Sequence, residues 1–484
     1  MNIVEQIIRR ADRRAVAIVA DDRCLTFGEL ETLTGEAAAQ LGSEGAQRIG
    51  LHCPNGIGHI VWSLAVLKCG GVLVPVAPEL SPLERDALVA LTGLDVVLCA
   101  GGRKWHKEAR RSRSLAVEGV GPARLTTGWR AGNTDFDESE LASLNPALIR
   151  FSSGTTGASR GVVLSHQTLF ERVTASNSHL RFGPGERVIW MLPMAHHFAV
   201  SIILYLLHGV TTVLENSHLG EDVFAALKRH QGTALYASPF HYALLASCAN
   251  AHPVPSLRIA VSTAAALPVE TSKLFFERFG IPLQQALGII ECGLPLLNDR
   301  WPLDKPESIG RPQKGYEVSI RSVEGYEVSA GAVGELFLRG PGFVDAYLSP
   351  WRSRPEILQN GWFRSGDQAR IDADGAVLLA GRSHSVINVG GMKCFPEEVE
   401  KVLDAHPLVR ESRVVALPHA TFGSVPSAEI VPVSERDPPR ISDLSGWCRA
   451  RLSLYKMPVK FNFVAAVART ASGKIQRCPS SWST

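Results

Sequence analysis

Residues 152–161, with the sequence SSGTTGASRG, combine the features that bind a phosphate group. The glycines let the backbone approach a ligand closely and present N–H groups, and the serine and threonine hydroxyls add further donors. The stretch also contains one arginine, which supplies positive charge. A hairpin loop rich in turn-forming residues is the plain structural alternative. The candidate phosphate-binding residues are Ser152, Ser153, Gly154, Thr155, Thr156, Gly157 and Arg160.

The segments on either side of this loop are expected to position it. Apolar residues 147–151 precede the loop and residues 162–166 follow it, and each run predicts a strand. The loop would therefore join two strands. It does not have the Walker pattern, because no G-x-x-x-x-G-K-[ST] fits it, and G-x-G-x-x-G is absent from the chain.

Length and composition limit what the chain can be. Its 484 residues exceed the roughly 250 to 300 at which single cores stop growing, so two or more domains are expected. A net charge of +3 disfavours a nucleic-acid binder, and nine scattered cysteines without a Cys-x-x-Cys pair disfavour a zinc site or disulfide framework. The N-terminus lacks a signal-peptide core, and the apolar run 198–207 is too short to span a bilayer. We expect a soluble, cytoplasmic protein that acts on small molecules, with neither nucleic acid nor membrane as partner.

Strand-like and helix-like segments alternate before the glycine-rich loop, which predicts a parallel or mixed sheet covered by helices. Ser81 is a candidate helix cap, and Thr26 with Glu29 fits a capping box. The polar segment 121–146 is expected to be an irregular surface connection. The expected strands are 48–55, 71–76 and 95–100, and the expected helices are 58–70 and 81–94.

The sequence pattern changes after about residue 381. Roughly 100 residues of compact α+β pattern follow, which suggests a second and smaller domain. The fold class is therefore α/β, with a large N-terminal domain of αβ-layered sheets at 1–381 and a small α+β C-terminal domain at 382–484. The expected elements of the small domain are helices at 395–406 and 441–452 and strands at 413–418, 428–433 and 461–467.

The glycine-rich loop resembles the phosphate loop of the adenylate-forming superfamily, which contains acyl-CoA and aryl-CoA synthetases, adenylation domains of peptide synthetases and firefly-type luciferases. In the family pattern [ST]-S-G-[ST]-T-G-x-P-K-G, Ser159 here replaces the proline and Arg160 the lysine. Further family motifs occur in the family's order, so the chain is identified as a divergent member. These motifs are VSTAAALP (261–268), QALGIIECG (285–293), GELFLRGPG (334–342), RSGDQARIDADG (364–375), AGRSHSVINVGG (380–391), FPEEVE (395–400) and RTASGKIQR (469–477).

The resemblance assigns nucleotide-binding roles in the large domain. Leu287 stands where an aromatic residue usually stacks on adenine, and Ile290 where a threonine usually meets phosphate. Glu291 is expected to bind Mg²⁺, which prefers oxygen ligands, and Asp367 to accept hydrogen bonds from both ribose hydroxyls. The plain alternatives are a helix-start carboxylate for Glu291 and a turn residue for Asp367. The remaining adenine-side residues are Ala264, Ala265 and Gly288.

The resemblance also assigns roles near and beyond the domain boundary. Lys474 would bridge the substrate carboxylate and the α-phosphate, although a lysine near a C-terminus is usually only a solvated charge. Arg382 would contact the ribose, and His384 occupies the hinge position about which the small domain turns. The residues expected to line a thiol tunnel, or else to form a plain turn, are Gly390, Gly391 and Lys393.

The segment 191–204 resembles the part of the family that gates the thiol tunnel, with His196 at the gate; a satisfied core or surface histidine is the plain alternative. Amino-acid-activating relatives place an aspartate next to this gate to pair with the substrate ammonium, whereas this chain has His197. We therefore expect a carboxylic acid without an α-amino group. A mainly apolar pocket would suit an aromatic or medium-chain acid, and its other candidate residues are Ser238, Ser262, Thr263 and Ile289.

These motifs predict an ATP- and Mg²⁺-dependent ligase that forms an acyl-AMP and pyrophosphate and then transfers the acyl group to coenzyme A. Joining a carboxylate to the α-phosphate of ATP requires cations and N–H groups that stabilise the developing charge. Transfer to the phosphopantetheine of a carrier protein, as in secondary-metabolism relatives, is one alternative. A nucleotide- or acyl-binding protein that has lost catalysis is another. A homodimer is a weak expectation from the family.

Overall fold

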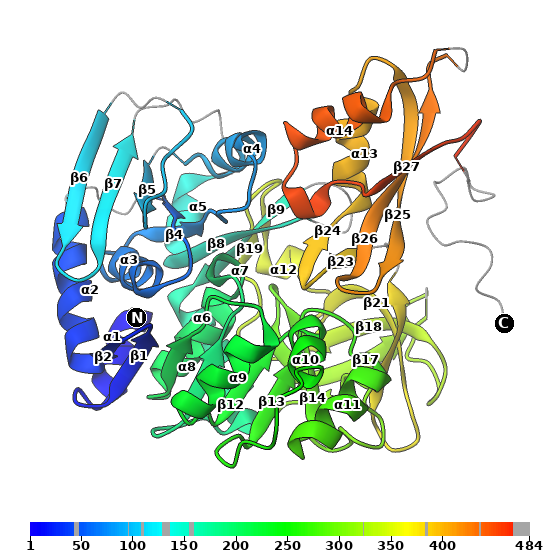
Figure 1. The fold of residues 1–484 in the computed structure, drawn as a ribbon. Coiled ribbons are helices and arrows are strands. Elements are labelled where there is room, and N and C mark those ends of the chain that lie inside the picture. Colours follow the sequence, from blue (N-terminus) through cyan, green and yellow to red (C-terminus); the bar gives the residue numbers. More distant parts are fainter. Residues whose placement is uncertain are drawn as a thin grey trace. The chain divides into compact units, whose positions relative to one another are not determined.

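The computed structural model describes residues 1–42, 48–94, 96–107, 111–127, 136–153, 159–322, 324–382, 386–434 and 437–467. These residues form two compact units. The first consists of the described residues in 1–78, 88–152 and 160–381, and the second of those in 79–87, 153–159 and from 382 onward. Figure 1 follows the chain through both units.

A large mixed sheet in the first unit contains the two strands that flank the glycine-rich loop. Its central strands are parallel and buried along their whole length, as expected for strands covered on both faces. At one edge lie two antiparallel strands, drawn side by side next to α2 (Phe27–Leu41) in Figure 1. In sheet order the strands are β20 (Arg352–Ser353), β19 (Ala346–Tyr347), β9 (Ser159–Ser165), β8 (Pro146–Ser153), β4 (Val72–Pro75), β3 (Arg48–His52), β5 (Val96–Ala100), β7 (Gly121–Thr127) and β6 (Arg111–Val117).

A second mixed sheet carries the other candidate motifs of this unit. Its inner strands are also parallel, so their carboxyl ends meet at one edge of the sheet. In sheet order the strands are β16 (Arg311–Pro312), β15 (Gly293–Leu297), β14 (Leu283–Ile289), β13 (Ile259–Ser262), β12 (Ala234–Ala237), β10 (Arg187–Trp190), β11 (Thr211–Leu214), β1 (Val16–Ala20) and β2 (Arg23–Thr26).

Helices connect the two sheets through a shared core. Helix α1 (Ile3–Arg10) contacts α3 (Ile57–Lys68), α6 (His166–Leu180) and α8 (Ile203–Leu207), and their apolar residues cluster with strands of both sheets. Helix α3 is buried nearly all around, with Trp62 fully inside. In the described part of the chain, no helix is long and apolar enough to cross a membrane. The other helices of this unit are α5 (Glu138–Ser143), α7 (Met194–His197), the π-helix η1 (Phe198–Ile202), α9 (Gly220–Arg229), α10 (Pro239–Ala246), α11 (Val269–Phe279) and α12 (Arg354–Ile357).

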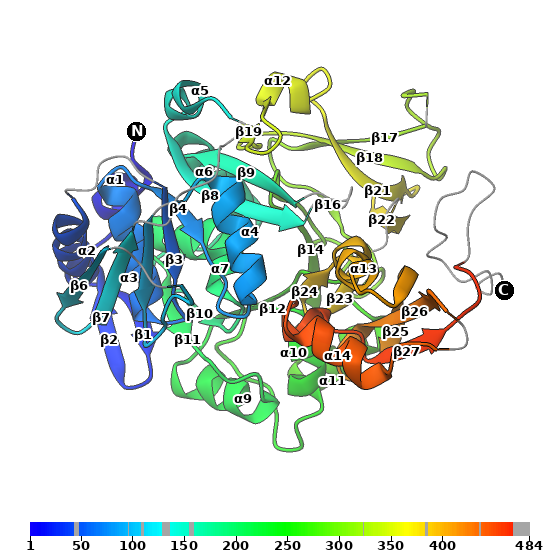
Figure 2. The same cartoon turned by 90° about the horizontal axis from the view of Figure 1, so that it is seen from above.

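A smaller antiparallel sheet completes the first unit and ends at the expected domain boundary. Figure 2 shows two of its strands, β17 and β18, lying side by side. In sheet order the strands are β17 (Glu317–Arg321), β18 (Gly334–Arg339), β21 (Phe363–Ile371) and β22 (Val377–Arg382).

The second unit has a core of its own. Its sheet packs against two helices, and residues such as Ile387, Val399, Ile430 and Leu444 are fully buried between them. Helix α4 (Pro82–Thr92) begins within its segment 79–87. The other elements are β23 (Ile387–Val389), β24 (Met392–Cys394), α13 (Pro396–Asp404), β25 (Val409–His419), β26 (Gly423–Pro432), α14 (Ile441–Arg449), the 3₁₀ turn η2 (Leu454–Lys456) and β27 (Lys460–Phe463).

Most expected elements are confirmed. The strands and helices expected between residues 48 and 100 appear as β3, α3, β4, α4 and β5, and those of the small domain as α13, β25, β26, α14 and β27. The capping box is present, because Thr26 N donates to Glu29 Oε2 at 2.7 Å and Glu29 N donates to Thr26 Oγ1 at 3.2 Å. Ser81 caps α4, since its hydroxyl accepts from Glu84 N at 3.3 Å.

The expected irregular connection at 121–146 is wrong. Residues 121–127 form β7, which pairs with both β5 and β6, and residues 138–143 form α5. The polar sequence of β7 is compatible with a strand because its partners supply the hydrogen bonds and its buried face needs only alternate apolar residues, such as Ala123 and Leu125.

Candidate active site

A single tyrosine links the glycine-rich loop to the candidate metal carboxylate. Glu291 lies in the turn between β14 and β15, and its Oε1 accepts a hydrogen bond from Tyr347 Oη at 3.1 Å. Tyr347 is in β19, which pairs with β9 at Val162. In β9, the Arg160 guanidinium carbon lies 5.2 Å from the centre of the Tyr347 ring. Strand pairing therefore brings Arg160 and Glu291 to opposite parts of one side chain.

The charges around Glu291 suit a site for a metal bound to phosphates. Burial, followed by the Glu291 carboxylate, raises the pKa of the Tyr347 hydroxyl far above its usual range, so the hydroxyl stays protonated and donates. Burial lowers the pKa of Arg150, in β8, to about 10, and the nearby Glu291 charge opposes that shift. Arg150 remains a cation at neutral pH. Glu291 thus lies near cationic side chains, which are also the groups that bind phosphate oxygens.

The donor set around Glu291 fits Mg²⁺ that arrives with a nucleotide. Among the residues that the structure describes, no group of three or more His, Cys, Asp or Glu side chains forms a protein cage for a metal. Mg²⁺ is commonly bound through one or two carboxylates, with the remaining ligands from phosphates and water. Glu291, half-buried and already oriented by Tyr347, would supply one such carboxylate.

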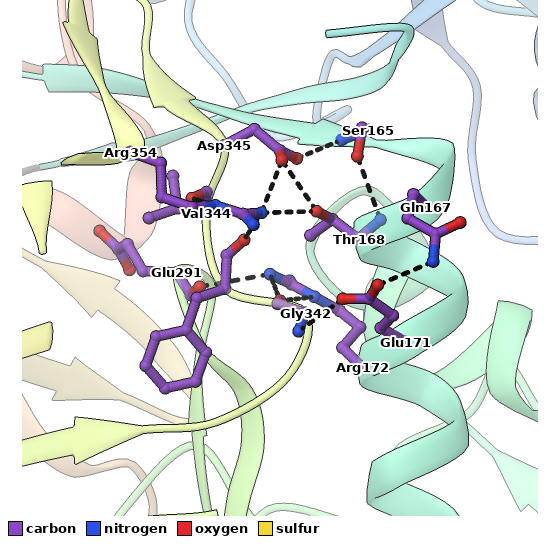
Figure 3. Close-up of polar contacts among 11 residues, drawn as sticks. Ser165, Gln167, Thr168, Glu171, Arg172, Glu291, Gly342, Val344, Asp345 and Arg354 are labelled. Carbon is purple, nitrogen blue, oxygen red and sulfur yellow. Dashed lines mark hydrogen bonds and ion pairs between the residues drawn. The ribbon is translucent and has the colours of Figure 1, made fainter. Parts of the chain in front are cut away.

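A second polar network holds the segment that carries Tyr347 onto helix α6 (Figure 3). The buried Asp345 carboxylate accepts from Ser165 N at 2.6 Å, from Thr168 Oγ1 at 2.9 Å and from Arg354 Nη2 at 2.6 Å. Arg354 also donates to Thr168 Oγ1 at 2.9 Å and to the carbonyls of Phe343 and Val344. This network joins α6, α12 and residues 343–345 into one scaffold beside Glu291.

The two candidate adenine-side motifs lie next to each other. Ala264, at φ 71°, lies in a turn after β13, and Leu267 N donates to Gln285 Oε1 of β14 at 3.0 Å. A Cβ placed on Gly288 would lie 3.6 Å from Thr263 Oγ1, so the two segments are in contact. Leu287 and Thr263 are buried, and the other residues of this group, Ala264, Ala265 and Ile290, are partly exposed.

Asp367 lies within a strand, so the alternative of a turn residue is wrong. It is 2% exposed in β21, and its backbone N–H donates to Ser365 Oγ at 3.0 Å. The pKa of the Cys292 thiol is raised well above its usual value by burial and by the charges of Glu291 and Asp367. The two acidic residues of the candidate nucleotide site therefore flank the same cysteine.

The candidate acyl-pocket residues follow neighbouring parallel strands. His196 and His197 lie on α7 after β10, both half-buried, and the His197 ring centre is 5.8 Å from that of Trp190. Ser238 follows β12 and is fully buried, with Oγ 2.8 Å from His241 Nδ1. Ser262 ends β13, and Ile289 ends β14. Because these strands are parallel neighbours, the residues lie along one edge of the sheet.

Several expected residues lie outside the described part of the chain. These are Gly154, Thr155, Thr156, Gly157, His384 and Lys474, and for Ser152, Ser153 and Arg382 only the backbone is described. In the second unit, Gly390 and Gly391 have φ of 58° and 99° in the turn between β23 and β24, and Lys393 is exposed. The Gly391 N–H donates to Asn388 Oδ1 at 2.8 Å, which fits a tight turn; the thiol-tunnel role stays a prediction.

Sequence reasoning missed Tyr347, Arg172 and the Asp345–Arg354 pair. Tyr347 follows the motif at 334–342 by a few residues, but nothing in its local sequence indicates a partner. Arg172 had a readable signal, because it falls on the apolar face of α6 together with Leu169 and Val173. A charged residue on a buried helix face must find polar partners.

Comparison with known proteins identifies the family. The family model of the AMP-binding enzyme matches residues 4–348, and that of the AMP-binding enzyme C-terminal domain matches residues 398–474. A sulfoacetate–CoA ligase of Cupriavidus necator is 31% identical over 472 residues, covering 94% of this chain and 91% of that protein. A feruloyl-CoA synthase of an Amycolatopsis species is 27% identical, covering 97% and 96%.

A solved structure shares the fold. The o-succinylbenzoate CoA synthetase of Bacillus subtilis superposes with a TM-score of 0.84 at 24% identity, covering 98% of this chain and 97% of that one. Its α/β architecture of a large N-terminal and a smaller C-terminal domain matches the fold class expected from the sequence. The chain therefore belongs to the AMP-binding enzyme family and is an AMP-forming ligase of the adenylate-forming superfamily.

Proposed function

We propose that this protein is an acid:CoA ligase that works in two half-reactions. A carboxylate oxygen attacks the α-phosphorus of ATP, which gives an acyl-AMP and releases pyrophosphate. The thiol of coenzyme A then attacks the acyl carbon, which gives the thioester, AMP and a proton. The observation that carries the proposal is the placement of Glu291 and Arg160 on Tyr347, a metal carboxylate and a phosphate-binding cation joined by one side chain.

The acid is proposed to lack an α-ammonium group. His197 lies where amino-acid-activating relatives have an aspartate, and no Asp or Glu occurs between Met191 and His208. A buried ammonium without a carboxylate partner would be strongly disfavoured. Aromatic and medium-chain acids are the first candidates, and the feruloyl-CoA synthase relative gives the aromatic class some support.

One observation favours a second class of substrate, namely acids with a polar tail. The Ser262 hydroxyl is fully buried at the end of β13, and no described protein atom hydrogen-bonds to it. A buried hydroxyl usually has a partner, and the polar tail of a substrate would provide one. The sulfoacetate–CoA ligase relative makes a small sulfonated acid a natural member of a test panel.

The test is an adenylation assay against a panel of acids with MgATP. Pyrophosphate release and hydroxylamine trapping of the acyl-AMP measure the first half-reaction. The panel should contain ferulate, 2-succinylbenzoate, medium-chain fatty acids, sulfoacetate and an α-amino acid. We expect turnover with at least one acid and none with the α-amino acid. Failure with every acid would refute the proposal, and preference for the α-amino acid would refute the substrate class.

The acceptor is tested with the best acid. Coenzyme A and carrier proteins with phosphopantetheine are offered side by side, and products are identified by mass spectrometry. We expect the coenzyme A thioester to form faster. Exclusive loading of a carrier protein would replace coenzyme A as the acceptor while leaving the first half-reaction intact.

Loss of the catalytic lysine tests whether the protein is a true enzyme. Lys474→Ala is expected to abolish pyrophosphate release, because the family role of this lysine is to bridge carboxylate and α-phosphate. Lys401→Ala, which removes an exposed lysine of α13, is the matched control and should retain activity. ATP binding without turnover in the unmodified protein would indicate a degenerate binding protein.

A further inference from the structure

Helix α6 places a fully buried arginine directly behind the candidate metal carboxylate. Arg172 has no exposed surface, and all of its hydrogen bonds described here go to backbone carbonyls rather than to carboxylates. Burial lowers its pKa from the usual value, but the group remains a cation at neutral pH. Burying this charge costs free energy unless each N–H donor of the guanidinium has a hydrogen-bond acceptor. The acceptors of Arg172 therefore identify the segments that it holds in place.

The contacts of Arg172 fix the backbone on both sides of the Glu291 peptide (Figure 3). Nη1 donates to Ile290 O at 2.8 Å, and Nη2 donates to Glu291 O at 3.3 Å. The same Glu291 carbonyl also accepts from Val344 N at 2.7 Å. Two successive carbonyls of the turn are therefore held, and the Cα that carries the Glu291 side chain lies between them.

The other end of the guanidinium holds the segment that leads to Tyr347. Nε and Nη2 donate to Gly342 O at 3.0 and 2.7 Å, and the preceding residue of the helix, Glu171, accepts from Gly342 N at 3.2 Å. Gly342 has φ 66°, and a Cβ there would lie 2.5 Å from Arg172 N. Only glycine lets this segment lie so close to the helix.

One side chain thus joins the two segments whose side chains meet as Glu291 and Tyr347. A lysine cannot reproduce this, because a single ammonium replaces a fork with five donors in fixed directions. The Asp345 and Arg354 side chains hold residues 343–345, and Val344 N of that segment donates to Glu291 O, but neither of these two side chains makes a described hydrogen bond to Glu291.

We propose that Arg172 is a positioning residue for metal-nucleotide binding: it holds the Glu291 turn and the Gly342–Tyr347 segment in the register that points the Glu291 carboxylate at the metal. Arg172 touches neither substrate nor metal. The inference rests on the proposed role of Glu291 but assigns a task to a residue that no motif of the chain includes.

The test compares Arg172→Lys with Arg48→Lys, a matched control that removes a fork bound to Glu138 and the Gly93 carbonyl, outside the Glu291 turn and the Gly342–Tyr347 segment. Binding of Mn²⁺·ATP is measured by electron paramagnetic resonance, and kcat, KM for MgATP and the half-saturating Mg²⁺ concentration by pyrophosphate release. For Arg172→Lys we expect Mn²⁺·ATP affinity to fall about tenfold, as for other groups that orient metal ligands. Excess Mg²⁺ should restore most of kcat. Arg48→Lys should leave the Mg²⁺ dependence within about twofold of the unmodified protein.

Thermal melting of both variants separates positioning from general stability. Equal loss of melting temperature with a change of Mg²⁺ dependence only in Arg172→Lys supports the proposal. Unchanged Mn²⁺·ATP affinity in folded Arg172→Lys would overturn it, as would the same shift in Arg48→Lys. If Arg172→Lys does not fold, Gly342→Ala, which pushes the same segment away from α6, takes its place with the same expectation. A protein that binds Mn²⁺·ATP but activates no acid would refute the proposed function without touching this inference.

Discussion

At the scale of single residues, Tyr347 serves two neighbours with two different parts of its side chain. Its hydroxyl donates to Glu291, while its ring lies under Arg160. The first contact orients a carboxylate, and the second is a cation–π contact worth roughly 0.5 to 2 kcal/mol. The chemistry of the site therefore depends on a residue that has no acid–base role of its own.

Tyr347→Phe removes the hydroxyl but keeps the ring. Loss of one hydrogen bond to a carboxylate should raise KM for MgATP about three- to tenfold with a smaller change in kcat. Tyr347→Leu removes both contacts and should raise KM further. Steady-state kinetics of pyrophosphate release measure both variants, and equal KM values for Phe and Leu would show that the ring contact contributes nothing.

The raised pKa of Tyr347 predicts how activity depends on pH. Burial and the Glu291 charge favour the neutral phenol, so the hydroxyl keeps its proton as the pH rises through the usual tyrosine range. If kcat/KM falls between about pH 8 and 10, this alkaline limb should then come from the ionisation of another group. The unmodified protein and Tyr347→Phe should share that limb. An alkaline limb that vanishes in Tyr347→Phe would contradict this assignment.

At the scale of elements, helix α6 organises the site although it carries none of the family motifs. Its N-cap, Ser165, accepts from Thr168 N at 3.1 Å, and the same first turn supplies Thr168 to Asp345. One turn further, Glu171 and Arg172 hold Gly342 from both sides. The cap thus fixes where the helix starts and, through it, where these side chains emerge.

Ser165→Ala should lower the free energy of unfolding by about 1 kcal/mol, the usual cost of losing a serine N-cap. Ser165→Gly is the matched control, because glycine at an N-cap costs only a few tenths. Urea unfolding measures both. An equal loss of unfolding free energy in Ser165→Gly and Ser165→Ala would show that the lost hydroxyl does not cause the destabilisation.

Helices and strands could be predicted from the sequence where the local pattern of residues determines them. The apolar strands β3, β4 and β5 and the capped helices α2 and α4 follow from hydrophobic runs and cap residues. Strand β7 was missed because its stability comes from pairing with β5 and β6, which sequence composition does not display. The motif residues Arg160 and Glu291 were found, but their joint contact with Tyr347 was not, because it depends on the pairing of β9 with β19.

At the scale of the whole molecule, the candidate residues are divided between the two units. Most of the nucleotide and acyl candidates that are described lie in the first unit, and Ser153, Arg382, Gly390, Gly391 and Lys393 lie in the second. The second unit has a charged centre of its own. Lys456 is 7% exposed, and its Nζ lies 2.6 Å from Glu84 Oε1 and 2.8 Å from Glu398 Oε2.

Lys456→Met should destabilise this unit by roughly 3 kcal/mol, because it leaves two carboxylates close together in a largely buried place. Calorimetric melting measures the loss. Adding Glu84→Gln to Lys456→Met removes one unpaired charge and should recover part of it. A double variant no more stable than Lys456→Met would show that charge repulsion is not responsible.

The same cluster predicts sensitivity to acid. Burial raises the pKa of Glu84, but the Lys456 charge and several hydrogen bonds together bring it below its usual value. A carboxylate with a depressed pKa contributes stability at neutral pH, and this contribution is lost as the pH falls through the folded-state pKa. The melting temperature of Glu84→Gln should therefore fall less steeply with acid than that of the unmodified protein. Parallel pH profiles would contradict this.

The second unit is built from separate stretches of chain, which include 79–87 and the described residues from 382 onward. This matters for recombination between relatives. A chimera made by exchanging everything after residue 381 would bring in a foreign partner for Glu84 and discard the lysine that neutralises it. Exchange of C-terminal parts within the family should succeed more often when the short stretch around Glu84 is transplanted with them, so the natural unit of shuffling is discontinuous in the gene.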